Sequence, residues 1–353
     1  MAIGRNLRVT LAFWLGLLVL GAGSPRPAEA ETTYEILSFS DLDGWARDDH
    51  RAALRAFQET CSDLKDRDWR AICAAVPSFG DAKLFFELLF RPVLIKDTSK
   101  GLFTGYFEPE LNGSKTPTAR FKYPVYRKPP EVREGVLWRS RRAIETTDIM
   151  KNRGLEIAWV DDPTALFFMQ IQGSGRIRLQ DGSYIRLGYR ASNGFRARSV
   201  GTELVRRGIY QPHQVSAAVI GNWVRRNGEA GLELLRDSPG YVFFRVIRNV
   251  PSAKGPLGAM NRSLTAMRSA AVDPRFVPLG APVWIEKRGQ TPFNHLFIAQ
   301  DTGSAIKGAQ RADIFFGTGA TAGRAAARLR DPGRMIVLLP IQRAYALLPE
   351  TVM

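Results

Sequence analysis

Aspartates near the C-terminal end of the chain are the residues best suited to acid chemistry. Asp301 and Asp313 each close a short β-like run, and a glycine-containing loop with Lys307 lies between them. A third, Asp273, follows a run of small residues and precedes Pro274. A carboxylic acid in such polar surroundings can protonate the departing oxygen of a glycosidic bond, because an alkoxide is a poor leaving group. Taken singly, each aspartate also fits an ordinary turn or cap.

The N-terminal part that follows the first thirty residues has helical periodicity. Asp49 could cap a helix whose apolar face extends to Cys61 and Leu64 in steps of three and four residues. Asp81 could cap a second helix that Pro92 ends, since proline cannot continue a helix. We therefore expect this region to be helical.

The pattern changes after Gly101 to short apolar runs that Gly, Pro, Asn and Asp interrupt. This pattern is typical of β-structure. Within it, Asp181 and Gly182 predict a hairpin with a type I′ turn. Helical periodicity returns over residues 200–235, and short β-like runs resume from Phe243 onward. The sequence therefore predicts a mainly β protein with N-terminal helices.

The first thirty residues are typical of an export signal. Arg5 and Arg8 precede an apolar run over residues 9–21, and the small residues around Ala30 predict cleavage before Glu31. A membrane anchor is the alternative, but the run is shorter than the roughly 20 residues that cross a bilayer. No cysteine near the predicted cleavage site could carry a lipid. We expect a soluble periplasmic protein.

The chain is strongly basic even without that signal. Removing residues 1–30 leaves 47 Lys and Arg against 33 Asp and Glu, a net charge of +14. The cations are scattered from Arg47 to Arg343 without a basic tail, which argues against nucleic acid as a partner. An anionic envelope polymer fits better, with at most peripheral membrane contact. An ordinary basic surface without such a partner remains the alternative.

The cysteines and histidines restrict other chemistries. Cys61 and Cys73 fit either a disulfide or two buried thiols, and an oxidising compartment favours the disulfide. None of His50, His213 and His295 has metal-ligand spacing to another candidate ligand. We therefore expect no metal site, no histidine-dependent triad and no cofactor.

Several ordered motifs together are more specific than any single aspartate. They resemble the membrane-bound lytic murein transglycosylase A family, including its C-terminal three-aspartate domain. The matching segments are Thr104-Gly105-Tyr106-Phe107-Glu108-Pro109, Gln170-Ile171-Gln172-Gly173-Ser174-Gly175-Arg176, Gly188-Tyr189 with Asn193-Gly194, Tyr241-Val242-Phe243-Phe244, Asp273-Pro274 with Val277-Pro278-Leu279-Gly280, Asp301-Thr302-Gly303 with Ile306-Lys307-Gly308, and Arg311-Ala312-Asp313-Ile314-Phe315.

The resemblance implies a particular domain organisation. After the signal peptide at 1–30, residues 31–106 would form the helical part of a double-psi β-barrel domain. Residues 107–241 would form an inserted second β domain, and residues 242–353 the C-terminal part of the barrel. The glycan would bind in a groove between the two domains.

The resemblance also implies which residues act on the glycan. Asp313 would be the catalytic acid and Asp301 its catalytic neighbour. The expected substrate-binding residues are Tyr106, Glu108, Gln172, Ser174, Asp273 and Lys307.

The activity that this resemblance implies is cleavage of the bond between N-acetylmuramic acid and N-acetylglucosamine in peptidoglycan. Asp313 would donate a proton, and the sugar's own C6 hydroxyl would then close a 1,6-anhydro ring. Two alternatives remain at this point: an inverting hydrolase that uses Asp313, Asp301 and water, or a non-catalytic wall-binding module. The partners would be glycan strands, with cell-wall machinery proteins as further candidates.

Overall fold

The computed structural model describes residues 32–251, 254–289 and 291–347. Contacts divide the chain into residues 1–31 and a second unit that begins at Thr32, and only the second unit is described below. The expected export signal and its cleavage site lie outside the described residues. No helix in the described ranges combines the length and apolar character needed to cross a membrane.

The N-terminal region contains the expected helices, but residues 33–36 and 90–96 within it form strands. Its helices are α1 (His50–Gln58), α2 (Arg67–Ala75) and α3 (Ala82–Leu89). The side chains of Asp49 and Asp81 cap α1 and α3 by accepting backbone N–H groups of the first turn, as expected.

Both helices end earlier than predicted. Cys61 and Leu64 lie beyond α1, where Cys61 begins a 3-10 turn and is bonded to Cys73 in a disulfide. The three- and four-residue spacing of apolar residues continues past Gln58, where the helix ends. Pro92 lies inside strand β2 (Phe90–Lys96) and ends no helix, because α3 already stops at Leu89.

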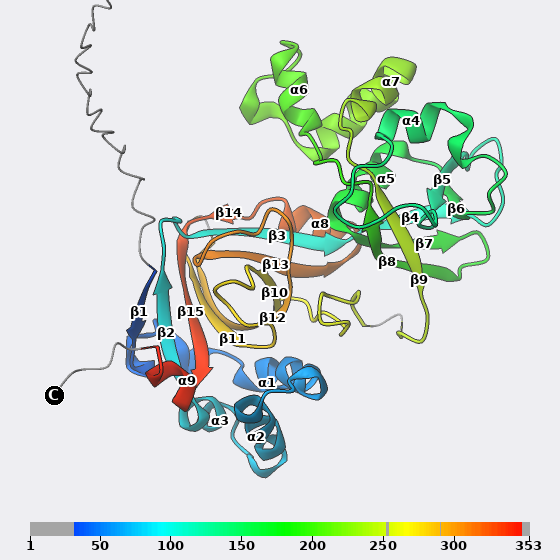
Figure 1. The fold of residues 1–353 in the computed structure, drawn as a ribbon. Helices are drawn as coiled ribbons and strands as arrows, with labels where there is room; N and C mark the ends of the chain where they lie inside the picture. The colour runs from blue at the N-terminus through cyan, green and yellow to red at the C-terminus, as the bar shows by residue number, and fades with distance from the viewer. Residues whose placement is uncertain (1–31, 252–253, 290, 348–353) are drawn as a thin grey trace, which may run out of the picture. The chain divides into compact units, whose positions relative to one another are not determined.

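Nine strands of the described chain form one mixed sheet (Figure 1). Two of its neighbouring pairs are parallel, β10 with β12 and β13 with β3, and the others are antiparallel. In spatial order the strands are β1 (Thr33–Ile36), β2, β15 (Gly333–Pro340), β11 (Pro282–Lys287), β12 (Phe293–Asp301), β10 (Ser269–Val272), β13 (Arg311–Thr318), β3 (Leu102–Glu108) and β14 (Arg330–Asp331).

Six further strands of the described residues form a second sheet. In spatial order they are β5 (Tyr123–Tyr126), β6 (Glu156–Val160), β4 (Glu110–Ser114), β7 (Ser174–Leu179), β8 (Tyr184–Ser192) and β9 (Val242–Ile247). The chain enters this sheet from β3 and leaves it after β9, so β9 belongs to the second sheet although the expected boundary at residue 241 separated it. Its pairing with β8 explains the difference.

The predicted hairpin joins β7 and β8, but its turn is of another type. A type I′ turn needs positive φ at both central residues. Only Gly182 has positive φ in this loop, and its N–H donates to the carbonyl of Leu179. The connection is therefore a type I turn followed by a left-handed glycine, in a loop one residue longer than predicted.

The remaining helices accompany the sheets. Gly228 interrupts the longest of them, α7, with a non-helical backbone conformation. Their bounds are α4 (Arg141–Thr146), α5 (Pro163–Gln172), α6 (Val200–Arg206), α7 (Ala217–Arg236), α8 (Gly319–Ala326) and α9 (Ile341–Tyr345). The mainly β character predicted from the sequence is confirmed.

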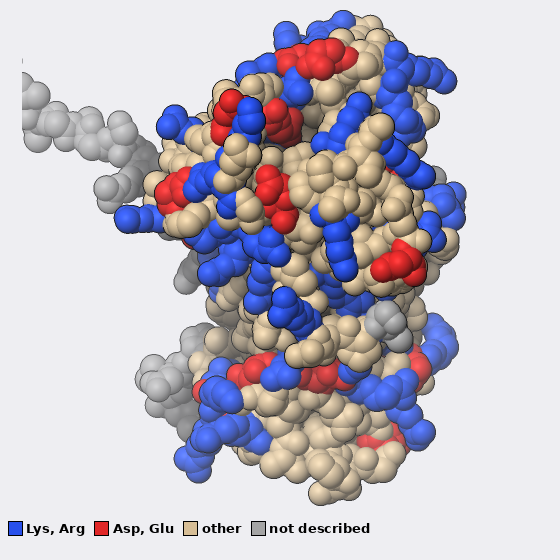
Figure 2. All heavy atoms as spheres, turned by 90° about the vertical axis from the view of Figure 1, so that its right-hand side faces the viewer, with Lys and Arg blue, Asp and Glu red and all other residues tan. Residues whose placement is uncertain are grey.

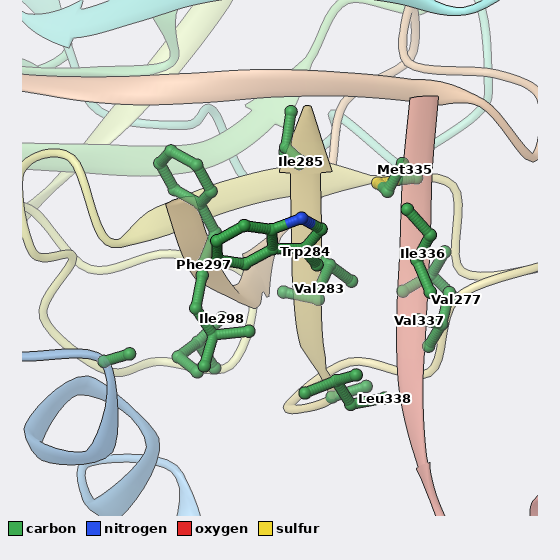
Figure 3. Packing of buried hydrophobic residues seen from close by; sticks show 14 of the residues in the cluster. Val277, Val283, Trp284, Ile285, Phe297, Ile298, Met335, Ile336, Val337 and Leu338 are labelled. Carbon is green, nitrogen blue, oxygen red and sulfur yellow. The ribbon is translucent and has the colours of Figure 1, made fainter. Parts of the chain in front are cut away.

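Each sheet has a hydrophobic core of its own. Figure 3 shows Trp284 of β11 packed among side chains of β12 and β15, including Phe297 and Ile336. The same core includes Phe57 of α1 and Phe86 of α3, so the N-terminal helices cover one side of this sheet. Val160, Met169, Ile177, Leu187 and Phe244 belong to the core of the second sheet.

Cationic side chains are widespread on the surface. On the face shown in Figure 2, Lys and Arg are distributed among neutral residues and smaller acidic groups, without gathering into one patch. This agrees with the scattered positions of the cations along the sequence.

Candidate active site

Neighbouring strands of the nine-stranded sheet bring the two expected catalytic aspartates into one row. Ala271 of β10 is in register with Asp301 of β12 on one side and with Asp313 of β13 on the other. On the next strand, Thr104 of β3 is in register with Asp313. Side chains of residues paired in this way share one face of a sheet. The row therefore places two carboxyl groups on either side of a small methyl group.

A β-bulge helps to direct Asp301 to this face. The pairing of β10 with β12 shifts between Ala270 and Ala271, so that Gln300 is skipped. Gln300 is buried, and its amide donates to the carbonyl of Ala56. Bulges of this kind change which side chain points to which face, and they are frequent beside active sites.

Asp313 points to the opposite face of β13 from its two immediate neighbours, which lie in the core. Ala312 and Ile314 are fully buried, as the alternation of a strand requires. The Thr104 hydroxyl donates to Asp313 Oδ1 at 2.6 Å, and the Arg311 guanidinium donates to the oxygen of that hydroxyl at 2.8 Å. Burial raises the pKa of Asp313, against the lowering effects of Thr104 and Arg311. Asp313 is thus shifted toward the protonated form of a proton donor.

Asp301 accepts three hydrogen bonds from different segments. Its Oδ1 accepts the N–H groups of Ala259 and Thr302, each at 2.9 Å, and its Oδ2 accepts the Tyr106 hydroxyl at 2.9 Å. Burial nevertheless raises the pKa of Asp301 to about 6, and the nearby Asp313 contributes to the increase. The charge of Asp313 therefore opposes ionisation of Asp301.

Tyr106 reaches Asp301 from β3, the strand beside Asp313. Two strands separate β3 from β12, which places them three strand spacings of about 4.8 Å apart in a flat sheet. The phenol reaches Asp301 because the sheet curves toward this face. The ring lies 5.3 Å from the Phe315 ring, centroid to centroid, and burial together with Asp301 raises its pKa well above the usual value. Tyr106 is therefore a neutral hydrogen-bond donor in the site.

Asp273 occupies a different position from the one expected of a substrate ligand. Its residue is 1% exposed, and its carboxylate accepts the N–H of Gly308 at 2.9 Å and the guanidinium of Arg275 at 2.6 Å. Hydrogen bonds from Arg275 and Gly308 lower the pKa of Asp273 to about 2, although burial opposes them. This geometry favours fastening of the loop after Asp301 over contact with a ligand.

Lys307 is part of the loop that Asp273 fastens. It is exposed and immediately precedes Gly308. The start of the loop is tied down by Thr302, whose hydroxyl donates to the carbonyl of Val272. Lys307 is therefore the accessible cation of a loop with both ends fixed.

The expected residues from the middle of the chain border this site to different degrees. Gln172 ends α5, and its side-chain oxygen accepts the N–H of Phe107 at 3.3 Å, next to Tyr106. Ser174 begins β7 and is part-exposed. Glu108 is fully buried, and burial raises its pKa. Its carboxylate accepts the Thr318 hydroxyl at 2.8 Å. Glu108 is thus enclosed by protein groups.

Sequence reasoning missed the residues that support the two carboxyls. Thr104 and Arg311 hold Asp313, and the backbone of Ala259 holds Asp301. Thr104 and Arg311 belong to the quoted motifs, so their polar character near Tyr106 and Asp313 was an available signal. The Ala259 contact has no side-chain signature. Within the described ranges, no group of three or more His, Cys, Asp or Glu could hold a metal ion.

Comparisons with known proteins show which family this chain resembles. Family models match the MltA specific insert domain over residues 102–245 and the 3D domain over residues 268–339. The membrane-bound lytic murein transglycosylase A of Vibrio cholerae is 33% identical over 264 residues, which cover 70% of this chain and 69% of that protein. Its namesake in Escherichia coli K12 is also 33% identical, over 67% of this chain and 65% of that protein.

Solved structures extend the similarity to most of the chain. MltA from Neisseria gonorrhoeae has a TM-score of 0.78 at 30% identity, covering 88% of this chain and 93% of its own. The membrane-bound lytic murein transglycosylase from Agrobacterium tumefaciens has a TM-score of 0.79 at 30% identity, with coverage of 90% and 100%. Escherichia coli MltA with bound chitohexaose has a TM-score of 0.71 at 25% identity, with coverage of 89% and 99%.

Proposed function

The chain belongs to the membrane-bound lytic murein transglycosylase A family and is a peptidoglycan lytic transglycosylase; from this premise we propose that it leaves 1,6-anhydro ends and uses Asp313 as its single acid and base. The observation that carries the proposal is the environment of Asp313. Its carboxyl is held by Thr104 and has a raised pKa because of burial. A protonated carboxyl held in one direction is what glycosidic bond cleavage requires.

The first step breaks the bond between N-acetylmuramic acid and N-acetylglucosamine. Asp313 donates its proton to the linking oxygen, the bond from that oxygen to the muramoyl C1 breaks, and the glucosamine sugar leaves as an alcohol. Positive charge develops at C1 in an oxocarbenium-like transition state. The newly ionised Asp313 lies beside this charge and stabilises it.

The second step closes a ring within the muramoyl sugar. Its C6 hydroxyl attacks C1 and returns a proton to Asp313, which restores the acid without consuming water. The attack has a large effective concentration because the nucleophile and C1 belong to one sugar. Asp301, held by Tyr106 and two backbone N–H groups, orients the sugar beside Asp313.

We propose that the glycan binds in a groove between the two sheets. We infer that the nine-stranded sheet is a double-psi β-barrel, into which residues 107 to about 247 are inserted, with β9 included. The strong curvature that lets Tyr106 reach Asp301 supports this inference. Tyr106, Gln172, Ser174 and Lys307 would line the groove, whereas the burial of Glu108 and Asp273 assigns them to its support.

Glycan strands of peptidoglycan are the proposed partner. The chitohexaose complex of the Escherichia coli relative supports an oligosaccharide as the ligand of this fold. The related enzymes are named membrane-bound, and we propose the periplasm as the place of action, where the net positive charge would favour the anionic wall.

Digestion of purified sacculi followed by mass spectrometry of the products tests this function. The enzyme should release muropeptides with 1,6-anhydromuramic acid ends, each lighter by one water than a hydrolytic end. The Asp313→Asn variant should release none above background. Reducing ends as the main primary product would support an inverting hydrolase, and binding without release would support a wall-binding module.

A further inference from the structure

A buried carboxylate lies where the chain crosses from the first sheet to the second. Glu108 is the last residue of β3, and Pro109 separates it from β4. Its side chain is 0% exposed, and Thr318 of β13 donates to Oε2. On the other side, Arg176 Nε of β7 lies 3.6 Å from Oε2, and Arg186 Nε of β8 lies 3.3 Å from Oε1. Glu108 thus connects strands of both sheets.

Arg186 extends this connection to the second crossing of the chain, between β9 and β10. Its side chain is 6% exposed. Its guanidinium donates to the carbonyls of Pro251, Lys254 and Gly255, at 3.3, 2.7 and 3.1 Å. One buried arginine therefore holds both crossings together, the first through a carboxylate and the second through main-chain oxygens.

The segment that Arg186 holds continues directly to Asp301. Gly258 packs so closely on β12 that an added Cβ would lie 2.5 Å from the carbonyl oxygen of Gln300. The next residue, Ala259, donates its N–H to Asp301 Oδ1. The turn itself is closed by the Gly258 N–H, which donates to the carbonyl of Arg262 at 2.9 Å. Movement at Gly255 would therefore reach the carboxyl group through a short, tightly packed turn.

We propose that Arg186 is a positioning residue for the lytic reaction: by fixing Pro251, Lys254 and Gly255 against Glu108, it keeps the Ala259 N–H on Asp301 and thereby holds that carboxyl in its catalytic orientation. This inference rests on the proposed function and adds a residue of the second sheet that touches neither aspartate. A displacement of about 1 Å at a reacting group can cost two orders of magnitude in rate, so a distant clamp can matter to turnover.

The titration of Asp301 reports on this clamp independently of turnover. The charged and titratable groups that influence it are Tyr106 from β3 and Asp313 from β13, and the N–H groups of Ala259 and Thr302 lower its pKa. Loss of the Ala259 hydrogen bond removes support for the ionised form. The pKa of Asp301 should then rise further above its ordinary value.

The test compares Arg186→Met with Arg190→Met, an exposed arginine on the same strand. Kinetics on sacculi and carbon-13 NMR titration of labelled aspartate carboxyls are measured for both, with the Asp301 signal assigned through Asp301→Asn. Arg186→Met should lower kcat/KM by roughly ten- to a hundredfold, mainly through kcat, and raise the Asp301 pKa. Arg190→Met should match the wild type in both. Arg186→Lys, which keeps the charge but loses the planar fork, should be intermediate.

Two further variants keep the proposal falsifiable if Arg186→Met does not fold. Glu108→Gln with Arg186→Met leaves no unpaired buried carboxylate, and Gly258→Ala pushes the turn from Gln300 without any change of charge. Both should raise the Asp301 pKa and lower kcat. An unchanged Asp301 pKa in folded Arg186→Met or in these variants would overturn the positioning role. If the wild type released no anhydro ends, the proposed function would be wrong. The NMR titration would still test whether Arg186 positions Asp301.

Discussion

Asp301 and Asp313 lie on opposite sides of β10, and both are in register with the same residue, Ala271. Two strand spacings separate their backbones, about 10 Å in a flat sheet and less in a curved one. Their side chains share a face, with only the Ala271 methyl between them. This placement explains why the charge of Asp313 contributes to the raised pKa of Asp301.

Asp313→Asn should abolish turnover while leaving the fold intact. Asparagine keeps the shape and can still accept the Thr104 hydrogen bond, but it has no acidic proton for the departing oxygen. We expect a loss of at least about 10²- to 10⁴-fold in kcat, the range of general acid catalysis, with glycan binding retained. Sacculus turbidity, oligosaccharide binding and far-UV circular dichroism measure the three quantities. Asp301→Asn should lower the activity less. If folded Asp313→Asn kept most of its activity, another carboxyl group would have to be the catalytic acid.

The activity should decrease as the pH rises through the raised pKa of Asp313, because only the protonated carboxyl can donate. The Thr104 hydroxyl favours the ionised form and so lowers that pKa. Thr104→Val removes this hydrogen bond and keeps the side-chain shape. The alkaline limb of kcat/KM should therefore move to higher pH in Thr104→Val than in the wild type. A limb that stays in place or moves to lower pH would contradict this role of Thr104.

Asp301→Asn should stabilise the protein near neutral pH. The pKa of Asp301 is raised from 3.8 to about 6 in the folded state, so the folded state binds the proton more tightly in this window. The free energy of unfolding consequently falls as the pH rises from about 4 to about 6. Above about pH 6, ionised Asp301 destabilises the folded state to the full extent. A shift of this size corresponds to roughly 1–3 kcal/mol after allowance for partial solvent access. Thermal unfolding at pH 4 and pH 7 measures it. If the stability advantage of Asp301→Asn over the wild type did not increase from pH 4 to pH 7, the raised pKa of Asp301 would be contradicted.

Asp273→Asn should destabilise the protein without a selective loss of glycan binding. The lowered pKa, about 2, means that the ionised carboxylate stabilises the fold above its unfolded value near 3.8. That contribution is lost as the pH falls from about 4 to about 2. Weakening the charged hydrogen bond to Gly308 should cost about 1–3 kcal/mol at pH 7, measured by denaturant unfolding. Arg275→Met gives the matched control for the ion pair. Weaker glycan binding by Asp273→Asn at unchanged stability would instead indicate that Asp273 contacts the glycan.

The structure brings Asp301, Asp313 and Tyr106 together on strands that the short motifs carry, while their roles in catalysis stay predictions. The sequence predicted the helix starts because Asp49 and Asp81 make local capping contacts. The predictions were wrong where pairing between distant parts of the chain determines the local structure. Pro92 is accommodated in a strand that pairs with β15, and β9 belongs to the second sheet through its pairing with β8.

The functions of buried charges were harder to predict than the positions of the motifs. Glu108 and Asp273 lie in the right motifs, yet both are enclosed by protein partners. A sequence alone does not reveal whether a carboxylate in a motif faces a ligand or an arginine. The Ala259 hydrogen bond to Asp301 comes from the backbone and from a crossing between sheets, so neither composition nor spacing could indicate it.

Digestion of sacculi in oxygen-18 water tests the central claim most directly. If the muramoyl C6 hydroxyl is the nucleophile and Asp313 acts first as acid and then as base, the new muramoyl ends should be 1,6-anhydro and carry no heavy oxygen. Mass spectrometry resolves both the missing water and the isotope. Reducing muramoyl ends that carry oxygen-18 as the main primary product would contradict the account, and they would make Asp301 the base that activates water.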